Sequence, residues 1–204
     1  MTIAPHGARA DDAPTGPDDR DRSAAHAAPE APTAPGQQPS PRACWAADLE
    51  RYGARAFLRE QSVWAVAVHR WGRAIDRRAP GLTRRVLTKA YWLVFRAVET
   101  ATGVSLPKGA TIGPGVRIHH FGGVFVNERA TIGARCTMRQ GVTIGSVDDD
   151  GPAPVIGDDV DLGAYAQVLG PVHVGDGARI GAMTVVLQDV PAGATAVGIP
   201  ARIV

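Results

Sequence analysis

Aliphatic residues recur at every sixth position through the C-terminal half of the chain. From Val126 to Val186, ten of the eleven positions in this register are aliphatic, and Asp150 is the exception. Neither an α-helix, in which apolar residues recur every 3.6 positions, nor a strand, in which side chains alternate, produces this spacing. A fixed period of six is typical of a β-helix, in which each hexapeptide forms one short strand and a corner. We therefore predict a left-handed parallel β-helix over residues 104–204.

The period also predicts which residues stack. Three hexapeptides complete one coil, so residues 18 apart should lie above one another, about 4.8 Å from coil to coil. We expect one ladder of Ile144, Leu162 and Ile180, and a second ladder of Ile156 and Val174.

Two irregularities interrupt the repeat. Two extra residues are inserted within HHFGG at 119–123, and the polar segment SVDDDGPAP at 146–154 is expected to replace one hexapeptide. Loops that leave such a stack are where function tends to be found. We therefore looked for the functional residues in these two segments.

Residues 43–103 are predicted to form a small helical domain. Two apolar stripes with helical spacing are separated by the helix-breaking pair Pro80 and Gly81, and Gly103 is expected to end the second helix. We expect both stripes to face a core or a helix–helix contact, and His69 to lie on a helix surface. The first stripe comprises Trp64, Ala67, Val68, Trp71 and Ile75, and the second comprises Leu82, Val86, Ala90, Leu93 and Ala97.

Composition bounds the remainder of the chain. Residues 1–42 consist largely of Ala, Pro, Asp, Gly and Arg with almost no large apolar side chains, which predicts a disordered tail. The expected fold class is thus α+β, with a tail, a helical domain and a β-helix.

The composition also disfavours several classes of function. The formal net charge is +2, and the arginines form no basic stripe with aromatic residues, so a nucleic-acid partner is not expected. No apolar run reaches the ~18 residues of a membrane span, and the N-terminus does not resemble a secretory signal. Two distant cysteines, Cys44 and Cys136, favour a reduced, cytoplasmic protein.

Three segments carry more information than the period alone: LPKGATIGPGVRIHHFGGVFVNERATIGARC, QGVTIG and VHVGDGARIGAMTVVLQDVPAGATAVGIPARIV. They resemble the hexapeptide acyltransferases, and most closely the serine O-acetyltransferase family. The resemblance covers residues 104–204 and extends more loosely back to about Cys44. It implies an acetyl-CoA-dependent O-acetyltransferase that acts as a trimer, or as a dimer of trimers assembled through the helices. The chain ends at Val204 without the longer tail by which some members dock a sulfhydrylase, so that complex is not expected.

The resemblance implies His120 as the general base. Histidine suits this role because it titrates closest to neutral pH, where a hydroxyl must lose its proton. Backbone N–H groups near Gly122 and Gly123 are candidate donors to the tetrahedral oxyanion. Transfer is expected to be direct, because neither cysteine is placed as a nucleophile. The residues expected to bind coenzyme A are Gly163, Ala164, Arg179, Gly181, Ala182 and Arg202.

The expected acceptor pocket departs from the family pattern. His119 stands where the family carries an aspartate for the amino group of serine, and Ser105 stands where it carries the aspartate that orients the base. The stretch DDDGPAP has no basic residue, whereas the family places an Arg-His pair there for the carboxylate. The residues expected to bind the acceptor are His119, Asn127, Glu128, Asp148, Asp149 and Asp150, and Glu128 or one of these aspartates is a candidate to orient the base.

These departures leave several functions open. L-Serine is the best single candidate for the acceptor, and a sugar or polysaccharide O-acetyltransferase is the main alternative because it needs only hydroxyl-binding groups such as Asn127 and Gln140. A non-catalytic β-helix scaffold is another. A zinc site like that of γ-class carbonic anhydrases is disfavoured, since adjacent histidines point to opposite sides of a strand, and no metal is expected.

Overall fold

The computed structural model describes residues 39–204 except 54 and 121. Helices come first in this part of the chain: α1 (Pro41–Tyr52), α2 (Ala56–Arg59), α3 (Ser62–Asp76) and α4 (Leu82–Thr102). The tail expected over residues 1–42 lies almost entirely outside the described residues, and α1 already begins at Pro41. Ser40 caps α1 by accepting a hydrogen bond from the N–H of Ala43, and Pro41 at the first helical position has no N–H to leave unpaired.

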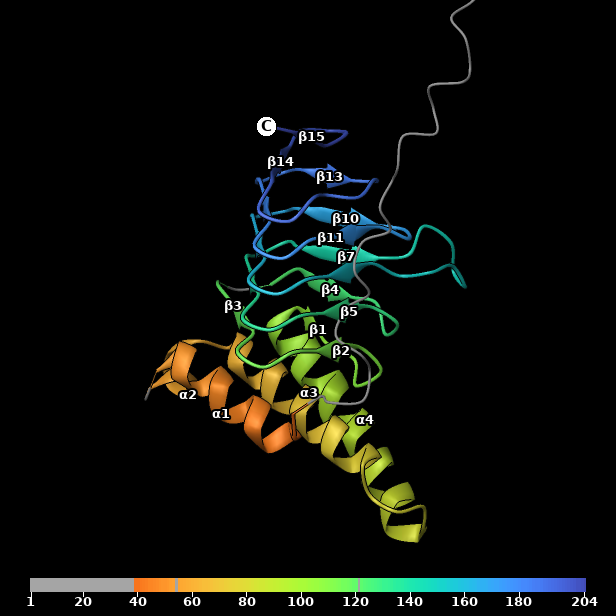
Figure 1. Ribbon diagram of the computed structural model, residues 1–204. Coiled ribbons are helices and arrows are strands. Elements are labelled where there is room, and N and C mark those ends of the chain that lie inside the picture. Colours follow the sequence, from red (N-terminus) through yellow and green to blue (C-terminus); the bar gives the residue numbers. More distant parts are fainter. Residues whose placement is uncertain (1–38, 54, 121) are drawn as a thin grey trace, which may run out of the picture. The chain divides into compact units, whose positions relative to one another are not determined.

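Short strands follow the helices and stack in coils (Figure 1). They are β1 (Val104–Ser105), β2 (Thr111–Ile112), β3 (Arg117–Ile118), β4 (Val124–Val126), β5 (Thr131–Ile132), β6 (Thr137–Met138), β7 (Thr143–Gly145), β8 (Val155–Ile156), β9 (Asp161–Leu162), β10 (Gln167–Leu169), β11 (His173–Val174), β12 (Arg179–Ile180), β13 (Val185–Val186), β14 (Thr195–Val197) and β15 (Arg202–Ile203). The strands form three sheets with the orders β1-β4-β7-β10-β13, β2-β5-β8-β11 and β3-β6-β9-β12-β14-β15. All pairings are parallel except that of β14 with β15.

The three sheets are the sides of a parallel β-helix, which confirms the predicted fold. In strands β2 to β13 the residue of the six-residue register is turned inward and buried, as at Ile112, Ile132 and Ile156 of one sheet. Burying a side chain of this size contributes roughly 1.5–3 kcal/mol, so repetition along the stack stabilises the coils.

One predicted ladder is correct and the other is wrong. Ile156 does stack on Val174. Ile144, however, stacks on Val126 and Val168, and Leu162 joins Ile180 in a different sheet. The polar segment 146–154 does not replace a strand. It projects from the corner between β7 and β8 and lengthens that coil from 18 to 24 residues, counted from Ile144 to Val168. Each later register residue therefore lies in a different sheet from the one predicted for it.

The helix boundaries follow the predicted signals. α3 ends before Pro80, and α4 ends at Gly103, which has a left-handed backbone (φ 64°) and donates its N–H to the carbonyl of Glu99. This is the geometry that glycine adopts at the C-terminal end of a helix.

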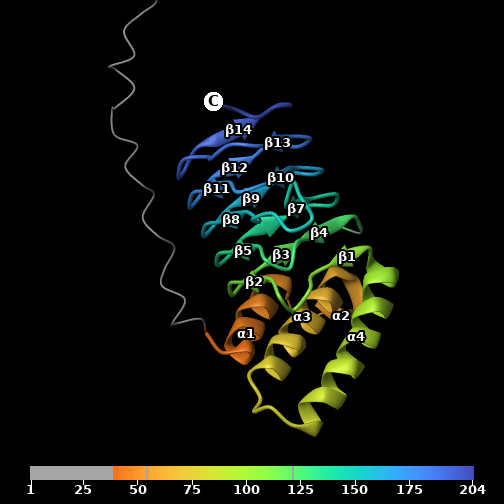
Figure 2. The ribbon, with the colours of Figure 1, turned by 90° about the vertical axis from the view of Figure 1, so that its right-hand side faces the viewer.

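The predicted buried faces of the helices are only partly correct. Val68 and Ile75 are buried, but Trp64 of the first stripe is 39% exposed. The second stripe is solvent-facing, with Leu82 and Leu93 more than 70% exposed. α4 lies beside α3 (Figure 2). The row of α4 that packs against α3 is a different one, and it comprises Leu87, Tyr91, Phe95 and Val98. The aromatic residues of this row bury more area than the aliphatic stripe would.

The helices cap the first coil of the β-helix. Strands β1, β2 and β3 each lie at the end of a sheet, so their outer backbone groups lack a strand partner. Arg70 of α3 donates to the carbonyls of Ile112 and Gly113, both at 2.6 Å, and is paired at 2.8 Å with Asp48 of α1. Asp48 accepts from the N–H of Val116 at 3.0 Å. This ion pair is almost fully buried.

Uncharged side chains complete this cap. The Tyr52 hydroxyl accepts from the N–H of Ile118 at 2.9 Å, and the Ser62 hydroxyl donates to the carbonyl of the same residue at 2.8 Å. His69 is 1% exposed, so its predicted surface position is wrong: its Nδ1 lies 3.2 Å from the carbonyl oxygen of Pro107. Burial lowers the pKa of His69 to about 3, with Arg70 adding to the effect, so its ring is neutral.

The last coil is closed by the backbone of the chain itself. After β14 the chain turns back, and β15 pairs with β14 in the antiparallel direction. The N–H of Val204 donates to the carbonyl of Thr195 at 2.9 Å, and that of Ala201 donates to Val185 at 2.9 Å. Among the described helices, none combines the length and apolar character needed to cross a bilayer.

Candidate active site

The strand register gathers several predicted site residues at one corner of the β-helix. The residues that follow β3, β6, β9 and β12 stack on one another, held by backbone hydrogen bonds such as His119 N–H to Met138 O at 2.8 Å and Gly163 N–H to Ile180 O at 2.8 Å. We call this surface the histidine corner. It comprises His119, His120, Arg139, Gln140, Gly163, Ala164, Gly181 and Ala182.

His120 is exposed at the start of this corner. Its backbone is left-handed (φ 70°), but so are those of Tyr165 and Met183 at the same corner and Asp159 at another. The conformation is therefore a property of the corners. The His120 ring centroid lies 6.1 Å from that of His119. No described side chain hydrogen-bonds to the His120 imidazole, so in one chain neither Glu128 nor the aspartates of 148–150 orient it.

His119 lies deeper than His120. Burial lowers its pKa, and the nearby charges of Arg117 and Arg139 act in the same direction. The neutral ring is therefore favoured near neutral pH. The neutral ring can donate or accept a hydrogen bond but supplies no negative charge. It differs in this from the aspartate that the sequence analysis expects at this position in the serine O-acetyltransferase family.

The helices form one wall of a hollow in front of the two histidines. The hollow has a volume of about 420 Å³ and is lined by Arg59, Glu60, Gln61, Ser62, His119 and His120. The sequence analysis missed this helical wall. No spacing signal connects Glu60 to a histidine 60 positions later, because the contact arises from the docking of helices on the first coil.

The two glycines after the histidine pair are suited to bind an oxyanion. Gly122 and Gly123 both have left-handed backbones, with φ of 83° and 75°. The carbonyl of Gly122 accepts from the N–H of Gly141 at 3.2 Å, while neither glycine N–H donates to a carbonyl among the described residues. Free N–H groups beside a base are the donors that a developing oxyanion requires.

The other residues expected to bind the acceptor lie at a different corner. Asn127 and Glu128 follow β4, and the segment 146–154 follows β7, whereas His120 follows β3. The Asn127 side chain donates to the hydroxyl of Ser146 at 3.1 Å, and Arg129 donates to the carbonyls of Asp149 and Asp150 at 2.9 and 2.7 Å. One chain therefore does not bring these residues to its own His120.

The four small residues expected to bind coenzyme A divide into two kinds. Gly163 and Gly181 are needed for coil stacking, since a Cβ would approach Ala182 N to 2.6 Å at the former and Val197 Cγ1 to 2.9 Å at the latter. Ala164 and Ala182 instead reach the surface of the histidine corner.

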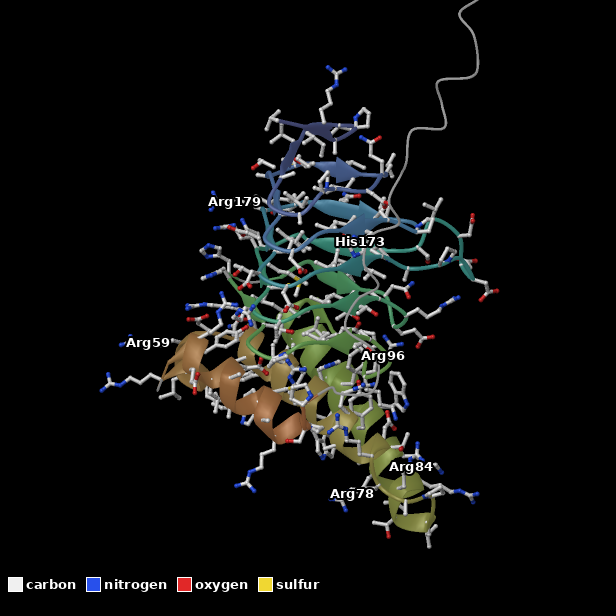
Figure 3. The ribbon with its side chains drawn as sticks, in the orientation of Figure 1. Arg59, Arg78, Arg84, Arg96, His173 and Arg179 are labelled. Carbon is white, nitrogen blue, oxygen red and sulfur yellow. The ribbon has the colours of Figure 1, made fainter. Side chains whose placement is uncertain are left out.

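The arginines expected at the phosphates are exposed. Arg179 points away from the coils (Figure 3), and Arg202 lies on β15. Gln140, between His120 and Ala164 in the stack, has a buried Oε1 without a hydrogen-bond partner in the described part of the chain. Tyr165 and Met183, each more than half exposed at this corner, were not anticipated from the sequence.

Neither cysteine is suited to covalent catalysis. Both are buried and unpaired, and burial raises the pKa of Cys44 and raises that of Cys136 to about 11. Their thiolates are thus disfavoured near neutral pH. Within the described residues no three His, Cys, Asp or Glu side chains cluster as metal ligands, and His173 lies on β11, in a sheet that excludes the histidine corner.

Comparison with protein families places the repeat among transferases. The model "bacterial transferase hexapeptide (six repeats)" matches residues 153–188, and "hexapeptide repeat of succinyl-transferase" matches residues 123–146.

Individual relatives and solved structures agree with one another. The serine acetyltransferase of Synechococcus elongatus is 43% identical over 105 residues, which is 50% of this chain and 43% of the relative; that of Helicobacter pylori is 40% identical over 120 residues, 56% and 70%. The structure of soybean serine acetyltransferase complexed with serine matches at 34% identity, TM-score 0.71, over 82% of this chain and 70% of that one. A serine acetyltransferase in complex with CoA matches at 31%, TM-score 0.66, over 81% and 70%. The chain spans about half the length of the serine acetyltransferases of Synechococcus elongatus, Mycobacterium tuberculosis and Bacillus subtilis.

Proposed function

The chain belongs to the serine acetyltransferase family, and on this premise we propose that it transfers the acetyl group of acetyl-CoA directly to a hydroxyl of a small acceptor, with L-serine as the first candidate. The observation that carries the proposal is the histidine corner. There an exposed histidine stands in line with surface alanines of the following coils, beside a hollow large enough for a small acceptor.

The proposed reaction has one base and one leaving group. His120 takes the proton of the acceptor hydroxyl, and the oxygen attacks the thioester carbonyl carbon. The negative charge that develops on the carbonyl oxygen is bound by the N–H groups of Gly122 and Gly123, which donate to no carbonyl among the described residues. The carbon–sulfur bond then breaks, and the coenzyme A thiolate takes the proton from the His120 imidazolium. No covalent enzyme intermediate is needed, in keeping with the buried thiols of Cys44 and Cys136.

Coenzyme A is proposed to lie along the histidine corner. From the coil of His120 to that of Ala182 the corner rises by three coils, about 14 Å at the usual strand spacing. Ala164 and Ala182 leave room for a narrow ligand, and Gln140 offers an unpaired amide oxygen. Exposed Arg179 and Arg202 are the proposed partners of the phosphates. The CoA complex of a family member supports this co-substrate.

L-Serine is favoured by the family, and a sugar hydroxyl is the second candidate. Relatives are named serine acetyltransferases, and one matching structure is a complex with serine. The sugar alternative is favoured by the segment 146–154, which has four polar residues and no basic one to hold a carboxylate. In this case the hydroxyl-binding groups would be Asn127, Gln140 and the aspartates Asp148, Asp149 and Asp150.

Assembly belongs to the same proposal. A trimer, or a dimer of trimers formed through the helices, would bring the Asn127 corner of one copy toward the histidine corner of the next. Light scattering on the purified full chain tests this, with a monomer as the contradicting result. The proposed setting is a reducing, cytoplasmic one, since the two cysteines are unpaired.

Thiol release from acetyl-CoA tests the activity. The full chain is assayed with L-serine, other hydroxy amino acids and nucleotide sugars, beside His120→Ala. We expect turnover that the variant lowers by about 10²–10⁴-fold, the usual contribution of a general base. Turnover that His120→Ala retains would reject the base assignment. Absence of both turnover and acetyl-CoA binding would favour a non-catalytic scaffold.

A further inference from the structure

The helical wall of the hollow holds one carboxylate at a fixed place. Glu60 lies between α2 and α3, and its backbone is held on both sides: its N–H donates to the carbonyl of Ala56 at 2.8 Å, and its carbonyl accepts from the N–H of Val63 at 3.2 Å. The Glu60 Oε1 lies 3.1 Å from Nη2 of Arg117. Arg117 is itself anchored, because it also donates to the carbonyl of Arg51. The carboxylate therefore cannot swing freely.

The other oxygen of this carboxylate is available to a ligand. Glu60 Oε2 makes no hydrogen bond among the described residues, and the Glu60 side chain is 29% exposed, so a small molecule in the hollow can reach it. Among the described residues that line the hollow, Glu60 is also the only acidic one. A partly shielded carboxylate attracts a cation more strongly than one in bulk water.

Within one chain, the described residues of the β-helix supply no negative charge to this hollow. His119 occupies the position next to the base and favours its neutral form. Arg129 holds Asp149 and Asp150 at another corner, and Asp148 lies in the same segment. An acceptor that carries an ammonium group beside its hydroxyl needs a negative partner close to the base. In the hollow, that partner is on the helices.

We infer that Glu60 binds the ammonium group of the acceptor, and that the site thereby selects a hydroxy amino acid or amino alcohol over a neutral sugar. The inference rests on the proposed O-acetyl transfer and adds to it a residue that determines which acceptor is used. It assigns to the helical domain a direct part in substrate recognition, besides its capping of the first coil.

The test compares two acceptors that differ by one ammonium group. Glu60→Gln keeps an oxygen to accept from Arg117 but removes the charge, and Glu50→Gln, on the exposed face of α1, is the matched control. L-Serine is assayed beside 3-hydroxypropanoate, which lacks the ammonium group. We expect Glu60→Gln to raise the KM for L-serine by about tenfold or more, with kcat and the KM for acetyl-CoA changed less than about threefold. The KM for 3-hydroxypropanoate stays unchanged.

Each other outcome overturns the inference. An equal rise in KM for both acceptors indicates a general disturbance of the hollow, and no rise for L-serine shows that Glu60 does not touch it. Wild-type turnover with a neutral sugar alone rejects the role of Glu60 and leaves O-acetyl transfer intact. If the wild type transfers to no acceptor, calorimetry with L-serine decides: binding that Glu60→Gln weakens about tenfold supports the inference, and absence of binding rejects it.

Discussion

The two ends of the β-helix are closed by different means. At the first coil, side chains from α1, α3 and α4 bind backbone groups of the coil; they include a buried ion pair, a buried histidine and the Tyr91 hydroxyl, which accepts from the N–H of Lys108. At the last coil, the backbone of β15 pairs with β14. Ile118, whose N–H and carbonyl both belong to the first cap, directly precedes His119 and His120. The first end therefore links stability to the geometry around the proposed base, whereas the last end lies several coils away from the histidine pair.

The largest expected effect comes from the ion pair of the first end. Arg70→Met leaves Asp48 as a buried charge without its partner and frees the carbonyls of Ile112 and Gly113. We expect a loss of about 3–5 kcal/mol in the free energy of unfolding, measured by urea denaturation. Arg96→Met is the control, because the Arg96 side chain is 74% exposed and its pair with Glu99 contributes about 0–1 kcal/mol. Equal effects of the two variants would contradict the proposed importance of the cap.

Acid should weaken the first end next. The pKa of His69 is about 3 in the folded chain, below its ordinary value of 6.5, so below pH 6.5 the unfolded chain binds a proton that the folded chain does not. Stability is therefore lost as pH falls from 6.5 toward 3, and by pH 5 the loss from this group is about 2 kcal/mol. In His69→Asn, whose amide can still donate to the Pro107 carbonyl, this part of the pH dependence should vanish from denaturation curves. It should remain in His173→Asn.

A smaller loss of stability is expected when one hydroxyl of the first end is removed, and it should be accompanied by a loss of activity. Tyr52→Phe removes the acceptor of the buried Ile118 N–H, for an expected loss of about 1–2 kcal/mol. Because Ile118 precedes the histidine pair, kcat should fall by about tenfold while the KM for acetyl-CoA is kept. Tyr165→Phe, at the exposed part of the histidine corner, should leave stability unchanged. A normal kcat in Tyr52→Phe would separate the cap from the site.

The smallest effect is expected at the last end. Removal of residues 202–204 takes away β15, whose side chains are all exposed, and its backbone pairing with β14. We expect a loss of about 1 kcal/mol in thermal or urea unfolding, with kcat unchanged. A loss as large as that of Arg70→Met would show that the two ends are equally important. A rise in the KM for acetyl-CoA would support the assignment of Arg202 to a phosphate.

The β-helix was predictable because each of its contacts repeats a local pattern. The six-residue register gave the inward residues correctly, from Ile112 to Val186, and the stop signals at Pro80 and Gly103 gave the helix boundaries. The ladder of Ile144 was wrong because the sequence does not state whether a polar segment replaces a strand or extends a corner. Both keep the same spacing to Ile156.

The helical domain was less predictable because its contacts are long-range. α4 carries two rows with helical spacing, and periodicity alone does not distinguish Leu93 of the exposed row from Tyr91 of the buried one. His69 is buried because α3 docks on the first coil, where the His69 Nδ1 lies 3.2 Å from the carbonyl oxygen of Pro107. For the same reason Glu60 could not be connected to the histidines, whereas His120 could, since the insertion in the repeat marks it directly.

Closing both ends has a consequence for the behaviour of the chain at high concentration. A β-helix with bare terminal coils offers unpaired backbone groups to the next molecule, and identical coils could then add end to end into a fibre. Here the helices cover the first end, and at the last end the two-residue strand β15 is the outer strand of its sheet, so only a short row of backbone donors and acceptors remains there. Copies are therefore expected to associate side by side, where the corners lie, rather than along the axis of the coils.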